Sequence, residues 1–217
     1  FYHSPLTSLV CLENTTNKGG GAGYDFEEFK RIREVCDKHN LGLHLDGARL
    51  FNAIVAKNED PLDYGKVFDT ISVCLSKGLG TPLGTVLIGD KEIMKNAIRV
   101  RKVLGGGMRQ VGFMAAAGLY ALENNVERLA EDHKRASEIG KVLKEQNYVG
   151  EVEPVETNIV IFYLKNPSAE GNFMKQLQQE NIRISNMGQG KLRIVTHLDY
   201  TNEMHEHFLN VLGNIEL

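Results

Sequence analysis

Leu75-Ser76-Lys77-Gly78-Leu79-Gly80-Thr81-Pro82-Leu83-Gly84 is the stretch of sequence that decides the fold. It follows residues 68–74, a short apolar and β-branched run that predicts a buried strand. Its glycines allow a sharp turn and let a flat ligand approach the backbone. A lysine at the edge of a buried sheet is poorly solvated, which favours the neutral, nucleophilic amine. Lys77 is therefore a candidate Schiff-base lysine, although a Lys-Gly pair after a strand is often only a solvated turn.

A second short apolar run supports the functional interpretation of Lys77. Residues 43–49 have the sequence Leu-His-Leu-Asp-Gly-Ala-Arg, so Asp46 and Arg49 stand at the end of another predicted strand. If the two strands are parallel neighbours, Asp46 and Lys77 lie at the same carboxyl edge, where open α/β sheets bind ligands. This pair suits pyridoxal phosphate, because the carboxylate binds the protonated pyridine nitrogen while the lysine holds the aldehyde as an imine.

The same residues resemble a known family, the low-specificity L-threonine aldolases. The resemblance begins with His44-Leu45-Asp46-Gly47-Ala48-Arg49 and Ser76-Lys77-Gly78-Leu79-Gly80-Thr81-Pro82. Further blocks follow it in the same order: Leu12-Glu13-Asn14-Thr15, Arg101-Lys102, Gly105-Gly106-Gly107-Met108-Arg109-Gln110 and Arg193-Ile194-Val195-Thr196-His197-Leu198-Asp199. The resemblance covers nearly the whole chain. It implies the α/β fold of the fold type I pyridoxal phosphate enzymes, with a mostly parallel sheet in a large domain and a small C-terminal α/β domain.

The expected domains follow from this resemblance and from a change in pattern along the chain. Residues 1–130 are expected to form the C-terminal part of the large cofactor-binding domain, and residues 131–217 the small domain, where short strands alternate with helices. In the resembled family the N-terminal third precedes this point. That third carries the phosphate-binding glycine turn and the histidine that stacks on the cofactor ring. We therefore expect the sequence to be a fragment.

The resemblance also implies roles for residues around the cofactor. Lys77 is expected to carry the cofactor and to release the product. Asp46 is expected to bind the pyridine nitrogen, and Arg49 to meet the phenolic oxygen. Ser76 is expected to donate to the phosphate, although a serine beside a lysine is common.

Substrate binding is expected to depend on cations. An arginine suits the carboxylate of an amino acid because its planar fork binds both oxygens. Arg193 lies on a predicted strand of the small domain and matches the family's block, and the alternative for it is a surface cross-strand salt bridge. Arg109 and Lys102, beside the glycines at 105–107, are expected to reach an active site, either their own or that of a neighbouring subunit.

Cleavage of a carbon–carbon bond next to a hydroxyl group needs a base. Histidine is suited to this task, since its unperturbed pKa is about 6.5. The family has a histidine just before the Leu-Glu-Asn-Thr strand, and His3 occupies that position. His197 is the second candidate, but the neighbouring Thr196 and Asp199 favour a structural role for it. The expected reaction is the retro-aldol cleavage of L-threonine and L-allo-threonine to glycine and acetaldehyde, with Lys77 and His3 as catalytic residues.

Composition limits the other classes of function. The chain has 217 residues, of which 42% are hydrophobic and 24% charged, as in an ordinary globular protein. A net charge of −3 gives no electrostatic reason to expect nucleic acid or an anionic membrane as a partner. No apolar run approaches the roughly 20 residues needed to cross a bilayer. The three cysteines, Cys11, Cys36 and Cys74, lack metal-binding spacing. We interpret them as buried, reduced thiols of a cytoplasmic protein without a metal site.

Several further expectations concern local structure and assembly. Residues 19–21, a glycine triplet without the spacing of a phosphate loop, predict a flexible surface loop. Residues 50–57 predict a helix, residues 61–67 a connector and residues 110–124 a tightly packed core helix. Residues 182–185 and 191–195 each predict a strand. The resemblance implies a homotetramer, arranged as a dimer of dimers with composite active sites, that acts in threonine catabolism and glycine biosynthesis. The alternatives are another pyridoxal phosphate-dependent lyase or transaminase on the same scaffold, and an inactive fragment that lacks the phosphate loop.

Overall fold

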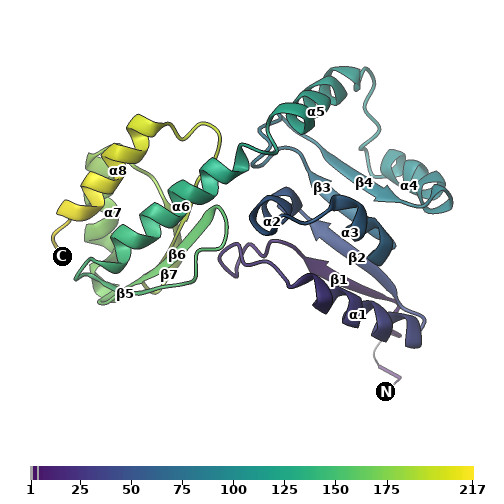
Figure 1. Cartoon of the computed structure of the whole chain (residues 1–217), viewed down its shortest axis with the longest axis horizontal. Helices are drawn as coiled ribbons and strands as arrows, with labels where there is room; N and C mark the ends of the chain where they lie inside the picture. The colour runs from purple at the N-terminus through teal and green to yellow at the C-terminus, as the bar shows by residue number, and fades with distance from the viewer. Residues whose placement is uncertain (1, 4) are drawn as a thin grey trace. The chain divides into compact units, whose positions relative to one another are not determined.

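The computed structural model describes residues 2–3 and 5–217, and its contacts divide the chain into two compact units. Unit 1 contains the chain up to Thr15 and Gly23–Val126, and unit 2 contains Thr16–Ala22 and Glu127–Leu217 (Figure 1). The chain therefore enters unit 2 twice, first through the short segment 16–22. The domain boundary at residue 130 stays a prediction.

Unit 1 is built on sheet A, whose strand order is β1-β2-β3-β4 among the described residues. The strands are β1 (Leu9–Glu13), β2 (Gly42–Gly47), β3 (Thr70–Cys74) and β4 (Thr85–Gly89). β1, β2 and β3 are parallel, and β4 is antiparallel to β3. The parallel pairing of β2 with β3, on which the interpretation of the two motifs depends, is confirmed.

The helices of unit 1 are α1 (Phe26–Lys38), α2 (Leu50–Lys57), α3 (Pro61–Val67), α4 (Lys91–Val103) and α5 (Gly112–Asn124). The prediction of a connector at residues 61–67 was wrong, because this segment is α3. Asp60 caps it by accepting a hydrogen bond from the backbone N–H of Leu62 at 2.8 Å. Pro61 is the first residue of the helix, a position where the missing N–H of proline costs nothing and its fixed φ favours the helix.

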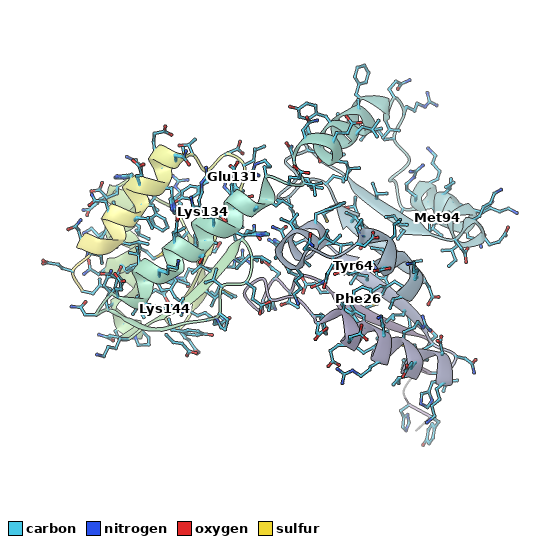
Figure 2. All side chains as sticks on the ribbon, viewed as in Figure 1. Phe26, Tyr64, Met94, Glu131, Lys134 and Lys144 are labelled. Carbon is cyan, nitrogen blue, oxygen red and sulfur yellow. The ribbon has the colours of Figure 1, made fainter. Side chains whose placement is uncertain are left out.

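An aromatic cluster joins α1 to α3 on one face of sheet A. Phe29 is fully buried at its centre. The rings of Phe26 and Tyr64 meet edge to face, with their centroids 5.1 Å apart (Figure 2). The same core includes alternate residues of β2 and β3, namely Leu43, Leu45, Ile71 and Val73. Burial of this cluster agrees with the prediction of buried strands from these two short apolar runs.

The part of unit 1 from β4 to α5 exposes many apolar side chains. α5 buries only Gly118 and Ala121, and the side chain of Phe113 is 78% exposed. The prediction of a tightly packed core helix was therefore wrong for this chain. A helix that is apolar on all sides is normally buried, and here no described residue covers its outer face.

Unit 2 is built on sheet B, an antiparallel sheet with strand order β5-β6-β8-β7. Its elements are β5 (Val149–Val152), β6 (Ile159–Leu164), β7 (Ser185–Gly188), β8 (Lys191–Val195), α6 (Leu129–Lys144), α7 (Glu170–Gln179) and α8 (Asn202–Asn214), with a short 3-10 helix at Pro167–Ala169. The three α-helices pack on one face, and α6 and α8 lie side by side (Figure 1). Lys134 and Lys144 mark the exposed side of α6 (Figure 2). The strand predicted at residues 182–185 is displaced, since β7 begins at Ser185.

Segment 16–22 packs on the opposite face of sheet B, so the flexible surface loop predicted for the glycine triplet was wrong. Gly20 and Gly21 are buried and have positive φ angles of 71° and 78°. A Cβ on Gly21 would lie 2.4 Å from Oγ1 of Thr157, and that hydroxyl donates to the carbonyl of Gly21 at 2.7 Å. Glycine is needed here for both the backbone conformation and the close approach.

The three cysteines differ in burial, which corrects the expectation that all are buried. Cys36 is buried, Cys74 is intermediate and Cys11 is exposed. Cys11 lies on the face of β1 opposite to Val10 and Leu12, which pack against the core. None of the described cysteines forms a disulfide.

A carboxylate on the face of sheet B that contacts segment 16–22 predicts a pH-dependent contribution to stability. Glu153 Oε1 accepts hydrogen bonds from Tyr163 Oη at 2.7 Å and Lys191 Nζ at 3.0 Å. Partial burial acts to raise the pKa of Glu153, but the bonds from Tyr163 and Lys191 outweigh it and hold this pKa below its ordinary value. The folded carboxyl therefore binds protons less readily than the unfolded one. Its stabilisation is present above the ordinary pKa and is lost as the pH falls through the lowered folded value.

We expect Glu153→Gln to lower the free energy of unfolding by about 1–2 kcal/mol at pH 7 and by much less at pH 3. Urea denaturation at the two pH values measures this difference. The exposed neighbour Glu151 provides a control, because Glu151→Gln should cost less than about 0.5 kcal/mol at either pH. If Glu153→Gln lowered the free energy of unfolding equally at pH 3 and pH 7, the shape of the Glu153 side chain rather than its charge would matter.

Candidate active site

The carboxyl edge of sheet A brings Asp46 and Lys77 to the same side of unit 1. Asp46 lies near the end of β2 and is in register with Ser72 of β3, and Lys77 follows the last residue of β3 by three positions. Both side chains are exposed. The poor solvation expected for Lys77 was therefore wrong for this chain, because its side chain lies in solvent although Leu75 and Leu79 of the same loop are buried. The ammonium nitrogen of Lys77 lies 3.5 Å from Sγ of Cys74.

The loop that carries Lys77 is fixed by its own backbone. The N–H of Leu75 donates to the carbonyl of Gly84 at 2.9 Å, which closes the base of the loop. The N–H of Gly80 donates to the carbonyl of Lys77 at 2.9 Å, which forms a turn directly after the lysine. Gly80 and Gly84 have φ angles of 75° and 128°, conformations that side chains disfavour. The glycine spacing read from the sequence thus determines where Lys77 is held.

The position of Asp46 is also fixed by hydrogen bonds. Its Oδ1 accepts from the N–H of Ala48 at 3.0 Å, and its backbone carbonyl accepts from the N–H of Asn14 at 3.0 Å. Asn14 and Thr15 are fully buried at the carboxyl end of β1, yet Oδ1 of Asn14 and Oγ1 of Thr15 have no hydrogen-bond partner among the described residues. Buried polar atoms that lack a hydrogen-bond partner at this edge fit a site that binds a polar ligand.

A buried tyrosine fixes the orientation of Asn14 at this edge. Oη of Tyr64 accepts from Nδ2 of Asn14 at 3.3 Å and donates to Oε2 of Glu59 at 2.5 Å. Burial, followed by the bond to Glu59, raises the pKa of Tyr64 well above its ordinary value. The phenol therefore stays protonated, and it holds the amide of Asn14 in one orientation.

Two more predicted cofactor residues lie in the same two loops. Arg49 is half-buried and immediately precedes α2, three residues after Asp46. Ser76 is exposed and immediately precedes Lys77. The structure thus places Asp46, Arg49, Ser76 and Lys77 at the carboxyl edge of β2 and β3. Their chemistry, a carboxylate, a guanidinium, a hydroxyl and an amine, fits the ring nitrogen, the oxygens and the aldehyde of pyridoxal phosphate.

The remaining predicted residues of unit 1 are not brought to Lys77 by the described structure. His3 lies in an exposed turn before the amino end of β1, whereas Lys77 follows the carboxyl end of the parallel strand β3 (Figure 1). Lys102 and Arg109 are exposed on α4 and in the loop after it. The side chain of Lys102 packs over Gly107, where a Cβ would lie 2.6 Å from its Cδ. The catalytic role of His3 and the substrate-binding roles of Lys102 and Arg109 stay predictions.

Arg193 lies in unit 2, on β8 in the interior of sheet B. Its Nη1 donates to Oδ1 of Asn17 at 2.9 Å, and its Nη2 lies 3.5 Å from Oγ of Ser185. Its Nε is buried and has no hydrogen-bond partner among the described residues. The described hydrogen-bond partners are thus neutral, unlike those of the surface salt bridge that was the alternative. A cavity of about 700 Å³ borders Arg193, Ser185 and Tyr200.

Sequence reasoning missed Asn17, the partner of Arg193. The two residues are 176 positions apart, so no local pattern connects them. The available signal was the glycine triplet at residues 19–21, whose conformation lets segment 16–22 reach sheet B. His197, by contrast, has the partner expected for a structural role, since its Nδ1 accepts from the N–H of Asp199 at 3.3 Å.

Two absences concern the described residues alone. No group of three histidine, cysteine, aspartate or glutamate side chains there could hold a metal ion. Within the same residues, every helix is too short or too polar to span a membrane.

A mostly parallel sheet with an aspartate and a lysine at its carboxyl edge, followed by a small antiparallel α/β unit, is the fold of the fold type I pyridoxal phosphate enzymes. The predicted fold class is confirmed by solved structures. A putative L-allo-threonine aldolase from Listeria monocytogenes superposes with a TM-score of 0.81 at 20% identity, over 97% of this chain and 62% of that one. A histidinol-phosphate aminotransferase from Clostridium acetobutylicum gives 0.68 at 18% identity, over 95% and 63%.

The chain belongs to the beta-eliminating lyase family, which it matches over residues 2–167. The predicted resemblance to the low-specificity L-threonine aldolases is also confirmed. The chain is 42% identical over 203 residues to the low specificity L-threonine aldolase of Escherichia coli O157:H7. That match covers 93% of this chain and 58% of the relative, so the chain spans little more than half the length of the protein it matches.

Proposed function

We propose that the protein to which this chain belongs cleaves L-threonine and L-allo-threonine to glycine and acetaldehyde with pyridoxal phosphate. The observation that carries the proposal is the placement of Asp46 and Lys77 at the carboxyl ends of two adjacent parallel strands. Similarity to proteins named low-specificity L-threonine aldolase favours this reaction over transamination or another lyase reaction on the same fold.

Four residues of unit 1 are proposed to hold the cofactor. The amine of Lys77 would bind its aldehyde, and the carboxylate of Asp46 its pyridine nitrogen. Arg49 would contact the phenolic oxygen, and Ser76 would donate to the phosphate. Bound there, pyridoxal phosphate supplies an electron sink that weakens the bonds to the α carbon of an amino acid.

The other proposed roles concern the substrate and its protons. Arg193 would bind the substrate carboxylate through its guanidinium, and Lys102 and Arg109 would contribute further positive charge. A ring nitrogen of His3 would take the proton of the β-hydroxyl group as the Cα–Cβ bond breaks and acetaldehyde leaves. The α carbon must then regain a proton to give glycine, and the amine of Lys77 would release that product.

Borohydride reduction followed by peptide mass mapping tests the cofactor site directly. The chain is incubated with pyridoxal phosphate and reduced, which fixes an imine as a stable amine. We expect a pyridoxyl group on the peptide that contains Lys77 and on no other lysine at comparable yield. An unmodified Lys77 in a folded sample would contradict the proposal for this chain. Acetaldehyde formed from L-threonine then separates aldol cleavage from β-elimination and transamination.

We further propose a homo-oligomer, a dimer of dimers, in which Lys102 and Arg109 reach a neighbouring subunit. Support comes from the exposed apolar side chains of α4, of its C-cap Leu104 and of α5, because large exposed apolar patches mark interaction surfaces. They include Val103, Leu104, Phe113, Leu119 and Tyr120, each more than half exposed. Light scattering during size-exclusion chromatography tests this, and a monomer at micromolar concentration would contradict it.

A cytoplasmic location and a role in threonine catabolism and glycine biosynthesis complete the proposal. They are supported by the free cysteines and by the named relatives. Subcellular fractionation tests the location, and recovery in a membrane or secreted fraction would contradict it.

A further inference from the structure

We propose that Asn17 is a positioning residue that orients the guanidinium of Arg193 toward an incoming carboxylate. This inference rests on the proposed role of Arg193 in binding the substrate. It assigns a function to segment 16–22, whose glycine triplet has no part in the cofactor site. Both residues belong to unit 2, so the argument needs only the internal structure of that unit.

The hydrogen bonds of Arg193 leave part of its guanidinium available. Oδ1 of Asn17 accepts a hydrogen bond from Nη1 at 2.9 Å. Oγ of Ser185 lies 3.5 Å from Nη2, at the limit of a hydrogen bond. Nε has no partner among the described residues. Among the described residues, Asn17 therefore makes the one short hydrogen bond that fixes the rotation of the guanidinium about its side chain. The nitrogens it does not use retain hydrogen-bonding capacity for an anion.

Segment 16–22 holds Asn17 in place through contacts at both of its ends. The N–H of Thr16 donates to the carbonyl of Ala22 at 3.0 Å, and the N–H of Gly21 donates to the carbonyl of Thr16 at 2.8 Å. The hydroxyl of Thr157 anchors Gly21 to sheet B at 2.7 Å. Asn17 thus sits on a closed turn that is bonded to the same sheet as Arg193. A rigid support of this kind is what a positioning residue requires.

The chemistry of the side chain explains why an asparagine suits this place. A neutral amide oxygen can fix one N–H of the guanidinium without neutralising its charge. An aspartate at the same position would form an ion pair with Arg193 and compete with the substrate carboxylate. We therefore expect Asn17→Asp to weaken carboxylate binding more than Asn17→Ala does, although it keeps the shape and the acceptor atom.

Nuclear magnetic resonance of the full chain with ¹⁵N-labelled arginine tests the proposal without requiring catalysis. The Nε–H signal of Arg193, assigned by its loss in Arg193→Lys, is followed during titration with acetate. We expect a saturable shift, with a dissociation constant about tenfold higher in Asn17→Ala, as loss of one hydrogen bond to a charged group predicts. Asn17→Ser keeps an oxygen acceptor and should recover part of the affinity. Asn166→Ala, the same change at an exposed position of unit 2, should have no effect.

The possible failures can be told apart. If the Arg193 signal of the wild-type chain does not respond to acetate, the proposed role of Arg193 fails. If it responds equally in wild type, Asn17→Ala and Asn17→Asp, only the role of Asn17 is overturned. Should Asn17→Ala not fold, Asn17→Ser and Asn17→Asp still decide the question. In the cofactor-loaded chain, Asn17→Ala should raise KM for L-threonine by a similar factor and change kcat by less than about twofold.

Discussion

Replacement of Lys77 by alanine is expected to lower kcat/KM for L-threonine cleavage at least about a thousandfold, because it removes the covalent anchor and the amine that releases glycine. The loop should keep its structure, since its hydrogen bonds run through the backbone of Leu75, Gly80 and Gly84. Acetaldehyde is measured by coupling its reduction to the oxidation of NADH. Circular dichroism should show an unchanged fold.

The matched control for Lys77→Ala is Lys66→Ala. Lys66 is exposed on α3, and its ion pair among the described residues is with Asp63, at 2.7 Å. Its loss should leave activity within about twofold and stability within about 0.5 kcal/mol. Retention of more than a tenth of the activity in Lys77→Ala would contradict the assignment of the anchor. A pyridoxyl adduct that moves to another lysine would contradict it as well.

The parts of the structure that sequence could predict are those set by local pattern. Residues 50–57 and 191–195 were expected as a helix and a strand, and α2 and β8 have these bounds. The edge that carries Asp46 and Lys77 was predicted because two apolar runs of strand length each end in a turn with glycine. Parallel pairing of such runs leaves only one edge where both side chains can lie.

The errors concern features that depend on residues distant in sequence. The exposure of Lys77 and of α5 is decided by what packs against them, which a single segment does not encode. The glycine triplet at 19–21 was expected to be a flexible loop. Thr157 and sheet B, against which it packs, lie more than a hundred residues away in sequence. α3 was missed for a local reason. Residues 61–67 were expected to be a connector, although proline is favoured at the first position of a helix.

The same distinction applies to the candidate site. Motifs identified the residues of the carboxyl edge, because amine, carboxylate and guanidinium chemistry is visible in the sequence. The support beneath them was not visible. Asn14 is held by Tyr64, fifty positions away, and Tyr64 in turn by Glu59. Hydrogen bonds of this kind, which hold the site residues rather than a ligand, connect strands to helices and form only when the chain is folded.

Asp46→Asn is expected to lower kcat/KM for L-threonine about a hundredfold to a thousandfold, the range typical for loss of one preorganised electrostatic contact. Asparagine keeps an oxygen that can accept the hydrogen bond from the N–H of Ala48, which is 3.0 Å long in the structure. The turn that this bond closes should therefore keep its conformation. What it removes is the negative charge that would keep a pyridine nitrogen protonated. The change therefore separates the electrostatic role of Asp46 from its structural one.

Comparison with two further variants completes the test of Asp46. Asp46→Ala removes both the charge and the hydrogen bond to Ala48, so it should lose the same activity and, in addition, about 1 kcal/mol of stability. Asp63→Asn changes an exposed carboxylate of α3 and should alter neither property. Activity is measured as acetaldehyde release and stability by urea denaturation. If Asp46→Asn kept activity within about threefold of wild type, the carboxylate would serve only the turn, and the ring nitrogen would need another partner.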